Sequence, residues 1–252
     1  MIKKIIVLFC LLACNLTAQI IVDPDRASNF SVGGGGGSAP SYVGNGGLHV
    51  GSGDSIEVDY PASISANDLL IVSLTHGYAS NEAIFDSIPG WYNGLHVDET
   101  LACATQFKWK RAVGSESGSV MFARNTYTSG GFYGVMTNWS GVVTTGTPYE
   151  DLDSWNTAGT DNATFTVPSC STLGTNRLVV AMIHVEDDFT IGTVSGGSYT
   201  EHFEVSTATG TDCAFAHDSQ EVATSSLIAS QTSTLSAAGW GVVYVMALKP
   251  TE

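Results

Sequence analysis

Apolar residues occur along this chain in short runs, separated by groups of Gly, Ser, Asn and Asp. Runs bounded by turn-forming residues are typical of β-strands, and no helical period extends beyond two turns. We expect strands at 41–49, 55–60, 69–76, 91–99, 102–111, 119–125 and 132–139, and again at 163–167, 178–186, 199–205, 212–222, 227–235 and 239–248. This pattern predicts an all-β, jelly-roll-like antiparallel β-sandwich.

Two kinds of strand are distinguished by their polarity. Residues 178–185 and 240–248 are apolar at both alternating positions, which predicts central strands that are covered on both faces. Residues 102–111 alternate instead, with Phe107 and Trp109 on one side and Gln106, Lys108 and Lys110 on the other. We therefore expect the basic side of this strand to face water.

The second half of the chain repeats the apolar pattern of the first at a constant offset (184 − 76 = 108). The offset aligns Leu70 with Leu178, His76 with His184, Phe107 with Phe215 and Phe132 with Trp240. We expect two pseudo-equivalent repeats, about 57–142 and 165–250, within one β-sandwich spanning 38–252. The two aligned histidines close their strands and are interpreted as structural.

Residues 1–18 have the basic, apolar and small-residue regions of a signal peptide, with cleavage after Ala18. The alternative is a lipoprotein attached through Cys14, because residues 11–14 resemble a lipobox. Residues 19–37 are rich in glycine and predict a flexible tether. No later apolar run is long enough to span a membrane, so we expect a secreted, extracellular or cell-surface protein without a transmembrane segment.

The chain carries 9 basic and 24 acidic residues and a net charge of −15, which becomes −17 when the leader takes Lys3 and Lys4 with it. This balance argues against nucleic acid, whose phosphates are bound by clustered Lys and Arg. It is compatible with neutral glycans and with calcium.

Three cysteines follow the leader: Cys103, Cys170 and Cys213. An odd number allows at most one internal disulfide in an oxidising compartment. The repeat places Cys103 near the equivalent of Cys213, on the same strand face, so a Cys103–Cys213 bridge is one alternative. The other is three small buried side chains.

Several short motifs, taken together, resemble a two-repeat β-sandwich domain of secreted bacterial proteins and of phage tail and other virion proteins. The motifs are Asn67–Asp68 with the apolar run to Leu74, Pro89–Gly90–Trp91, Lys108–Trp109–Lys110, residues 138–142 and residues 247–250. The resemblance covers about 39–250 and implies a module for display, attachment or binding. It implies no catalytic residues, and the leader favours an exported bacterial protein.

The candidate ligand site lies in the segment that joins the two repeats, which we expect to be a loop. Tyr149 and Trp155 have no equivalent in the repeat, and polar groups that suit a neutral sugar accompany them. The candidate ligand-binding residues are Tyr149, Glu150, Asp151, Asp153, Trp155 and Asn156.

A second acidic segment contains Glu186, Asp187 and Asp188. Carboxylates gathered in a loop suit calcium, although the spacing matches no known calcium loop. Calcium binding and solvated acidic residues are the two interpretations, and we expect no other cofactor.

The sequence favours a secreted, non-enzymatic β-sandwich module that acts in surface attachment or in extracellular or virion assembly. Its expected partners are a cell-surface or extracellular protein or a neutral glycan, and homo-oligomers are a further alternative. A carbohydrate-binding module for neutral glycans is the alternative function. A glycan hydrolase is the third, because pairs of catalytic carboxylates are recognised by their spatial separation.

Overall fold

The computed structural model describes residues 37–51, 54–77, 86–99, 103–123, 131–157, 159–208 and 212–252. The predicted leader, and the predicted tether up to residue 36, lie outside this range. Residues Gly34–Glu252 form one compact unit. In the described ranges every regular element is a strand, as the sequence predicts.

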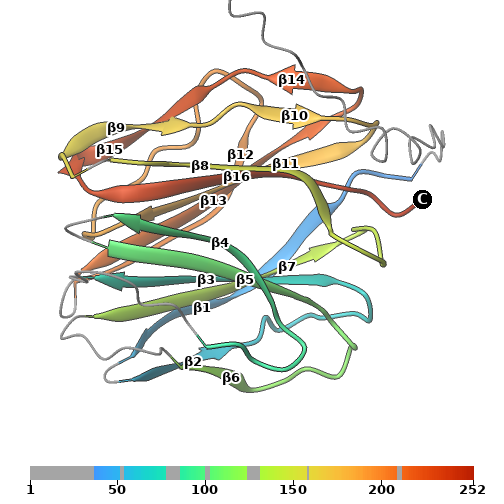
Figure 1. Ribbon diagram of the computed structural model, residues 1–252, viewed down its shortest axis with the longest axis horizontal. Coiled ribbons are helices and arrows are strands. Elements are labelled where there is room, and N and C mark those ends of the chain that lie inside the picture. The colour runs from blue at the N-terminus through green and yellow to red at the C-terminus, as the bar shows by residue number, and fades with distance from the viewer. Residues whose placement is uncertain are drawn as a thin grey trace, which may run out of the picture. The chain divides into compact units, whose positions relative to one another are not determined.

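The described residues form sixteen strands, which follow one another in the order of the chain (Figure 1). The first seven are β1 (Ser41–Gly51), β2 (Ser55–Asp59), β3 (Leu69–Gly77), β4 (Tyr92–Glu99), β5 (Cys103–Arg111), β6 (Ser119–Ala123) and β7 (Phe132–Ser140). The others are β8 (Tyr149–Asn156), β9 (Asn162–Val167), β10 (Cys170–Thr172), β11 (Arg177–Val185), β12 (Thr200–Thr207), β13 (Cys213–Val222), β14 (Ser226–Ile228), β15 (Gln231–Gly239) and β16 (Gly241–Leu248). None of the described segments contains a helix that is long and apolar enough to cross a membrane.

Two five-stranded antiparallel sheets form the body of the sandwich. Their strand orders are β1-β7-β3-β5-β4 and β8-β16-β11-β13-β12. Each order places the first strand of its half at an edge, beside the last strand of that half. Two-stranded sheets, β2-β6 in the first half and β9-β15 and β10-β14 in the second, complete the fold.

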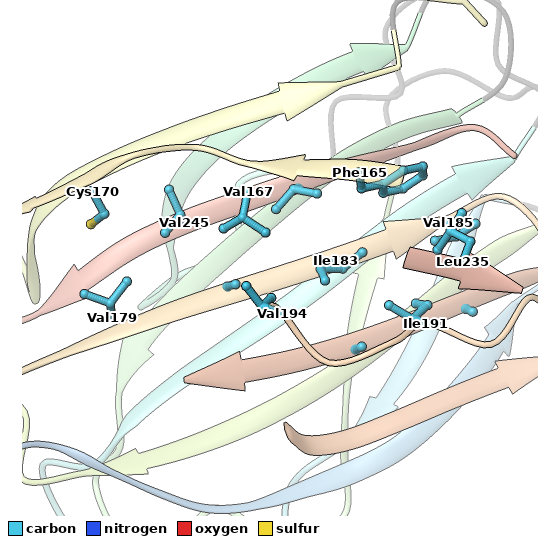
Figure 2. Packing of buried hydrophobic residues seen from close by; sticks show 14 of the residues in the cluster. Phe165, Val167, Cys170, Val179, Ile183, Val185, Ile191, Val194, Leu235 and Val245 are labelled. Atoms are coloured by element: carbon cyan, nitrogen blue, oxygen red, sulfur yellow. The ribbon is translucent and has the colours of Figure 1, made fainter. Parts of the chain in front are cut away.

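The hydrophobic residues form layers. The outer core of the first half joins β2 and β6 to one face of its five-stranded sheet, through residues such as Ile56, Phe122 and Leu70. The outer core of the second half joins β9 and β15 to one face of the other large sheet (Figure 2). The remaining faces of the two large sheets meet in a central layer, where Ile71 packs in one cluster with Val180.

This layering explains why the middle strands are apolar at both alternating positions. β11 is buried along its length after Arg177, and β16 is buried throughout. The prediction that these segments are central strands covered on both faces is confirmed. Successive side chains of a strand point to opposite faces, so a strand between two cores needs apolar residues at nearly every position.

The prediction that the basic side of β5 faces water is wrong. Gln106 and Lys108, which were expected to face water, are 3% and 0% exposed. Lys108 Nζ donates to Asn93 Oδ1 at 2.6 Å, and Lys110 Nζ lies 5.7 Å and 5.8 Å from the ring centroids of Tyr60 and Trp91. Neighbouring segments thus contact the face that the alternation assigned to solvent.

The predicted repeat register, with its offset of 108, is also wrong for two pairs of strands. Leu70 packs in the first outer core, whereas Leu178 packs in the central layer. Phe132 likewise lies in the first outer core, whereas Trp240 precedes β16 and is only partly buried. A shift of one position moves every side chain to the other face of a strand. Because both faces are buried here, the apolar pattern does not reveal such a shift.

Candidate functional site

The predicted ligand segment is a strand and not a loop. Residues Tyr149–Asn156 form β8, which pairs with β16 and lies at the edge of the second large sheet. The ring of Tyr149 packs against the central layer, 6.4 Å from that of Phe107, whereas Trp155 packs against the second outer core, 5.3 Å from Phe165. The two rings therefore contact different cores and do not form one platform.

Two carboxylates of β8 bond to a nearby segment of the same chain, residues 171–177. Glu150 Oε1 pairs with Arg177 Nε at 2.9 Å and also accepts from the backbone N–H of Leu173 at 2.6 Å. Asp151 accepts from the backbone N–H of Ser171. These bonds tie β8 to the segment around β10. Ligand binding by the β8 residues stays a prediction.

The predicted calcium segment contributes two residues to an acidic cluster. Asp187 and Asp188 lie with Asp212, each offering an oxygen within 4.8 Å of the others, while Glu186 is outside this group. Burial, together with Asp187 and Asp161, raises the pKa of Glu186 to about 7. Oxygen ligands suit calcium, but exposed acidic groups often gather without an ion. Calcium binding stays a prediction for this cluster.

The predicted Cys103–Cys213 bridge also stays a prediction. Cys213 is buried with Tyr133, Val135 and Phe215 in the central layer. Cys103 begins β5, and its side chain lies outside the described part of the structure. Cys170 is a buried free thiol in the second outer core, and burial, with nearby carboxylates, raises its pKa to about 12.

A row of polar side chains crosses the central layer. Thr75 Oγ1 lies 3.1 Å from His184 Nδ1, and Ser73 Oγ lies 3.2 Å from His217 Nε2. Tyr244 donates to the backbone carbonyl of Thr105 at 2.8 Å. Each contact joins the first large sheet to the second, so directional bonds cross-link the two sheets within an otherwise apolar layer.

Burial keeps the two central histidines neutral. It lowers the pKa of His184 to about 3, and it lowers the pKa of His217 well below its ordinary value, with a further contribution from His184 and His202. Among the described residues, His184 Nε2 and His217 Nδ1 have no hydrogen-bond partner. Protonating either ring would bury a charge, which is unfavourable.

A cavity of about 410 Å³ lies beside the end of β13. Most of its polar groups come from β12 and β13, and its aromatic wall comes from β1. The lining residues are Pro40, Ser41, Tyr42, Leu178, Ser198, Thr200, His202, Ser219, Gln220 and Glu221. A second cavity, of about 520 Å³, is lined by Gly37, Ser38, Ala39, Asn176, Glu221, Val222 and Ala223.

Both cavities follow the same seam. Residues 37–42 form one side and residues 219–223 form the other, and Glu221 lines both. We call these two cavities together the β1–β13 groove. Asn176 donates from Nδ2 to the carbonyl of Gly37 at 2.7 Å, and its backbone N–H donates to the carbonyl of Ala223 at 3.3 Å. Asn176 thus holds the two sides of the groove together.

His202 is fixed in the first cavity by three neighbours. Its Nε2 lies 2.7 Å from Ser219 Oγ, its ring stacks on Tyr42 with the centroids 4.5 Å apart, and it meets Trp139 edge-on at 5.6 Å. Burial lowers its pKa, so the ring is neutral at pH 7. A serine and a histidine at this distance can act as nucleophile and base when a third group orients the base. Here the orientation comes from stacking on an aromatic ring.

Sequence reasoning did not find the groove. Tyr42, His202 and Ser219 lie far apart in the chain, and each was assigned only to a predicted strand. Nothing in their spacing indicates that β1 passes beside the end of β13. The signal that the sequence does offer is the polar residues Ser219 and Glu221, which follow the mostly apolar start of β13.

Comparison of the chain with protein-family models, with curated proteins and with solved structures finds no match in any of the three.

Proposed function

We propose that this protein is a secreted, non-enzymatic attachment module that recognises a neutral glycan in the β1–β13 groove. The observation that carries the proposal is the first cavity. It combines an aromatic wall, Tyr42, with the hydroxyl groups of Thr200 and Ser219 and the carboxylate of Glu221. Concave sites that present a few placed polar groups beside an apolar wall are the usual form of small-molecule sites.

The charge of the lining favours a neutral ligand. Among the described residues that line the groove, Glu221 is the one acidic side chain, and burial lowers the pKa of His202, the one histidine. Neither set of described lining residues includes a Lys or Arg that could bind a carboxylate, sulfate or phosphate group. A ligand that carries hydroxyl groups can donate to Glu221 without bringing a second negative charge near it.

The geometry supports binding better than hydrolysis. His202 and Ser219 are close enough for proton transfer, but none of the described contacts joins a carboxylate to His202. Acyl-transfer sites also aim free N–H groups at the oxyanion. Ser219 instead lies within β13, paired with Val180 on one side and Thr200 on the other. We therefore assign Ser219 and His202 to ligand contact.

We further propose that the protein is a jelly-roll-like β-sandwich built from two pseudo-equivalent halves, as the resemblance to secreted and virion two-repeat domains implies. An offset of 109 places Leu69 and Ile71 on Leu178 and Val180, all of which lie in the central layer. Two contacts across that layer also join residues that are 109 apart, Ser73 with Met182 and Thr75 with His184. Contacts between equivalent residues are expected on a twofold axis, which supports this proposal.

A glycan array tests the proposed function. We expect the full chain to bind neutral glycans and to bind acidic ones more weakly. Thr200→Ala and Ser219→Ala should lower binding at least tenfold, while Leu227→Ala, an exposed change outside the groove, should leave it unchanged. Binding that is the same in all three variants would place the site elsewhere. Absence of binding to every glycan would overturn the proposal.

A further inference from the structure

The two cavities of the β1–β13 groove are arranged in series. Consecutive residues of one segment line them, 40–42 in the first cavity and 37–39 in the second. The opposite side is equally continuous, from Ser219 to Ala223. Glu221 lines both cavities and therefore lies where they adjoin.

Each cavity alone is large enough for a small ligand. The volumes of about 410 Å³ and 520 Å³ both fall within the roughly 300–1,000 Å³ range of small-molecule sites. Their chemistry differs, however. The first cavity has an aromatic wall and several side-chain hydroxyls, whereas the second is formed largely by small residues and by Asn176.

We propose that the groove binds an extended chain of neutral sugar units, with one end in the Tyr42 cavity and the following units in the Asn176 cavity. This inference rests on the proposed function and specifies its ligand as an oligosaccharide and not a single sugar. The Tyr42 cavity supplies most of the directional contacts. The Asn176 cavity adds affinity for further units, and Glu221 contacts the chain where it passes from one cavity to the other.

Glu221 suits this position because it is exposed and takes part in none of the ion pairs among the described residues. Its carboxylate can accept hydroxyl hydrogens from neighbouring sugar units. Asn176 supports the second cavity by its bonds to Gly37 and Ala223. Its φ of +55° lies in the left-handed region, which asparagine tolerates better than most residues.

The test measures affinity against ligand length. Titration calorimetry with cello-, laminari- and manno-oligosaccharides of one to six units should show, in the series that binds, affinity rising at least tenfold from the single sugar to the trisaccharide. Ala223→Trp places a large ring in the second cavity and should remove that gain, leaving the affinity for the single sugar unchanged. Ala237→Trp makes the same change at an exposed position of β15 and should retain the full gain. Thermal unfolding of both variants checks that the fold is intact.

The outcomes separate this inference from the proposed function. If Ser219→Ala weakens binding but Ala223→Trp changes the affinity for no length, the ligand occupies the Tyr42 cavity alone. The inference that the groove binds an extended oligosaccharide is then wrong, whereas the proposal of glycan binding stands. Equal affinity for one and three units in the wild type would overturn the inference in the same way. If no member of the three series binds and the array is also negative, both proposals fail.

Discussion

The second outer core and the central layer are both buried, but they use different chemistry. Phe165, Ile183 and Val243 are typical of the outer core, where apolar packing is the main interaction. The central layer adds hydroxyl and imidazole groups, such as Thr75 and His184, that bond across it. Apolar contacts are not directional and tolerate sliding, whereas a hydrogen bond weakens steeply when its geometry changes.

The difference assigns separate tasks to the two regions. Burial in the outer cores favours a compact fold without selecting one alignment of neighbouring layers. The polar pairs of the central layer form in the observed alignment of the two large sheets, and a buried polar group that loses its partner costs about 1–3 kcal/mol. The central layer therefore selects the register between the sheets, and the changes below test that division of tasks.

The largest effect is expected from a cavity in the outer core. Phe165→Ala removes a fully buried ring between β9 and its neighbours and should lower the free energy of unfolding by about 3–5 kcal/mol. Urea unfolding measures the change. Leu227→Ala, at a side chain that is 69% exposed, is the control and should stay within about 0.5 kcal/mol of the wild type. A similar small loss in both variants would show that the outer core is loosely packed.

A pH titration of stability separates the central histidines from other groups. The unfolded chain protonates His184 and His217 near pH 6.5, but the folded protein does not, so stability falls as pH drops below 6.5. Each ring contributes up to about 1.4 kcal/mol per pH unit. Glu186 and Asp218, whose pKa values are raised to about 7 and about 6, act in the opposite direction because the folded state binds their protons first.

The two carboxyl groups determine the pH range in which the loss of stability in acid becomes visible. They offset the histidines until their own unfolded forms protonate, near pH 4.5 for Glu186 and 3.8 for Asp218. The steepest loss is therefore expected below about pH 4.5. His217→Gln keeps a polar partner for Ser73 but does not titrate here, so its stability should depend less on pH than that of the wild type. An unchanged slope would show that His217 is accessible to protons in the folded state.

Isosteric exchanges in the two regions sharpen the comparison. Thr75→Val leaves His184 without its partner and should cost about 1–3 kcal/mol although the side-chain volume is kept. Val243→Thr places a hydroxyl in the outer core and should cost a similar amount, because the side chains of the cluster around it are apolar. Urea unfolding of both variants checks the pair. If Thr75→Val leaves the free energy of unfolding unchanged, the hydrogen bond between the two sheets does not contribute to stability.

The smallest effect is expected at the groove. Glu221→Gln changes an exposed side chain that makes none of the described ion pairs, so stability should stay within about 0.5 kcal/mol of the wild type. Its affinity for a bound oligosaccharide should nevertheless fall. A variant that loses stability instead would assign Glu221 to the fold and not to the ligand.

Much of the strand inventory follows from the sequence alone. Apolar runs of strand length, bounded by Gly, Ser and Asn, locate β3, β7, β11 and β16. In β11 the residues at both alternating positions are apolar, which indicates that both faces of this strand are covered. These properties are local, because they depend on the burial of a strand and not on the identity of its neighbours.

The tertiary structure decided what lies opposite each residue. Burial on both faces removed the polarity signal that distinguishes an offset of 108 from one of 109, so only the packing of Leu70 and Leu178 in different layers revealed the shift. Lys108 is buried and donates to Asn93 of the neighbouring strand β4, and the groove lies where β1 passes beside the end of β13. These contacts join different strands, and the order of residues along the chain carries no direct record of them.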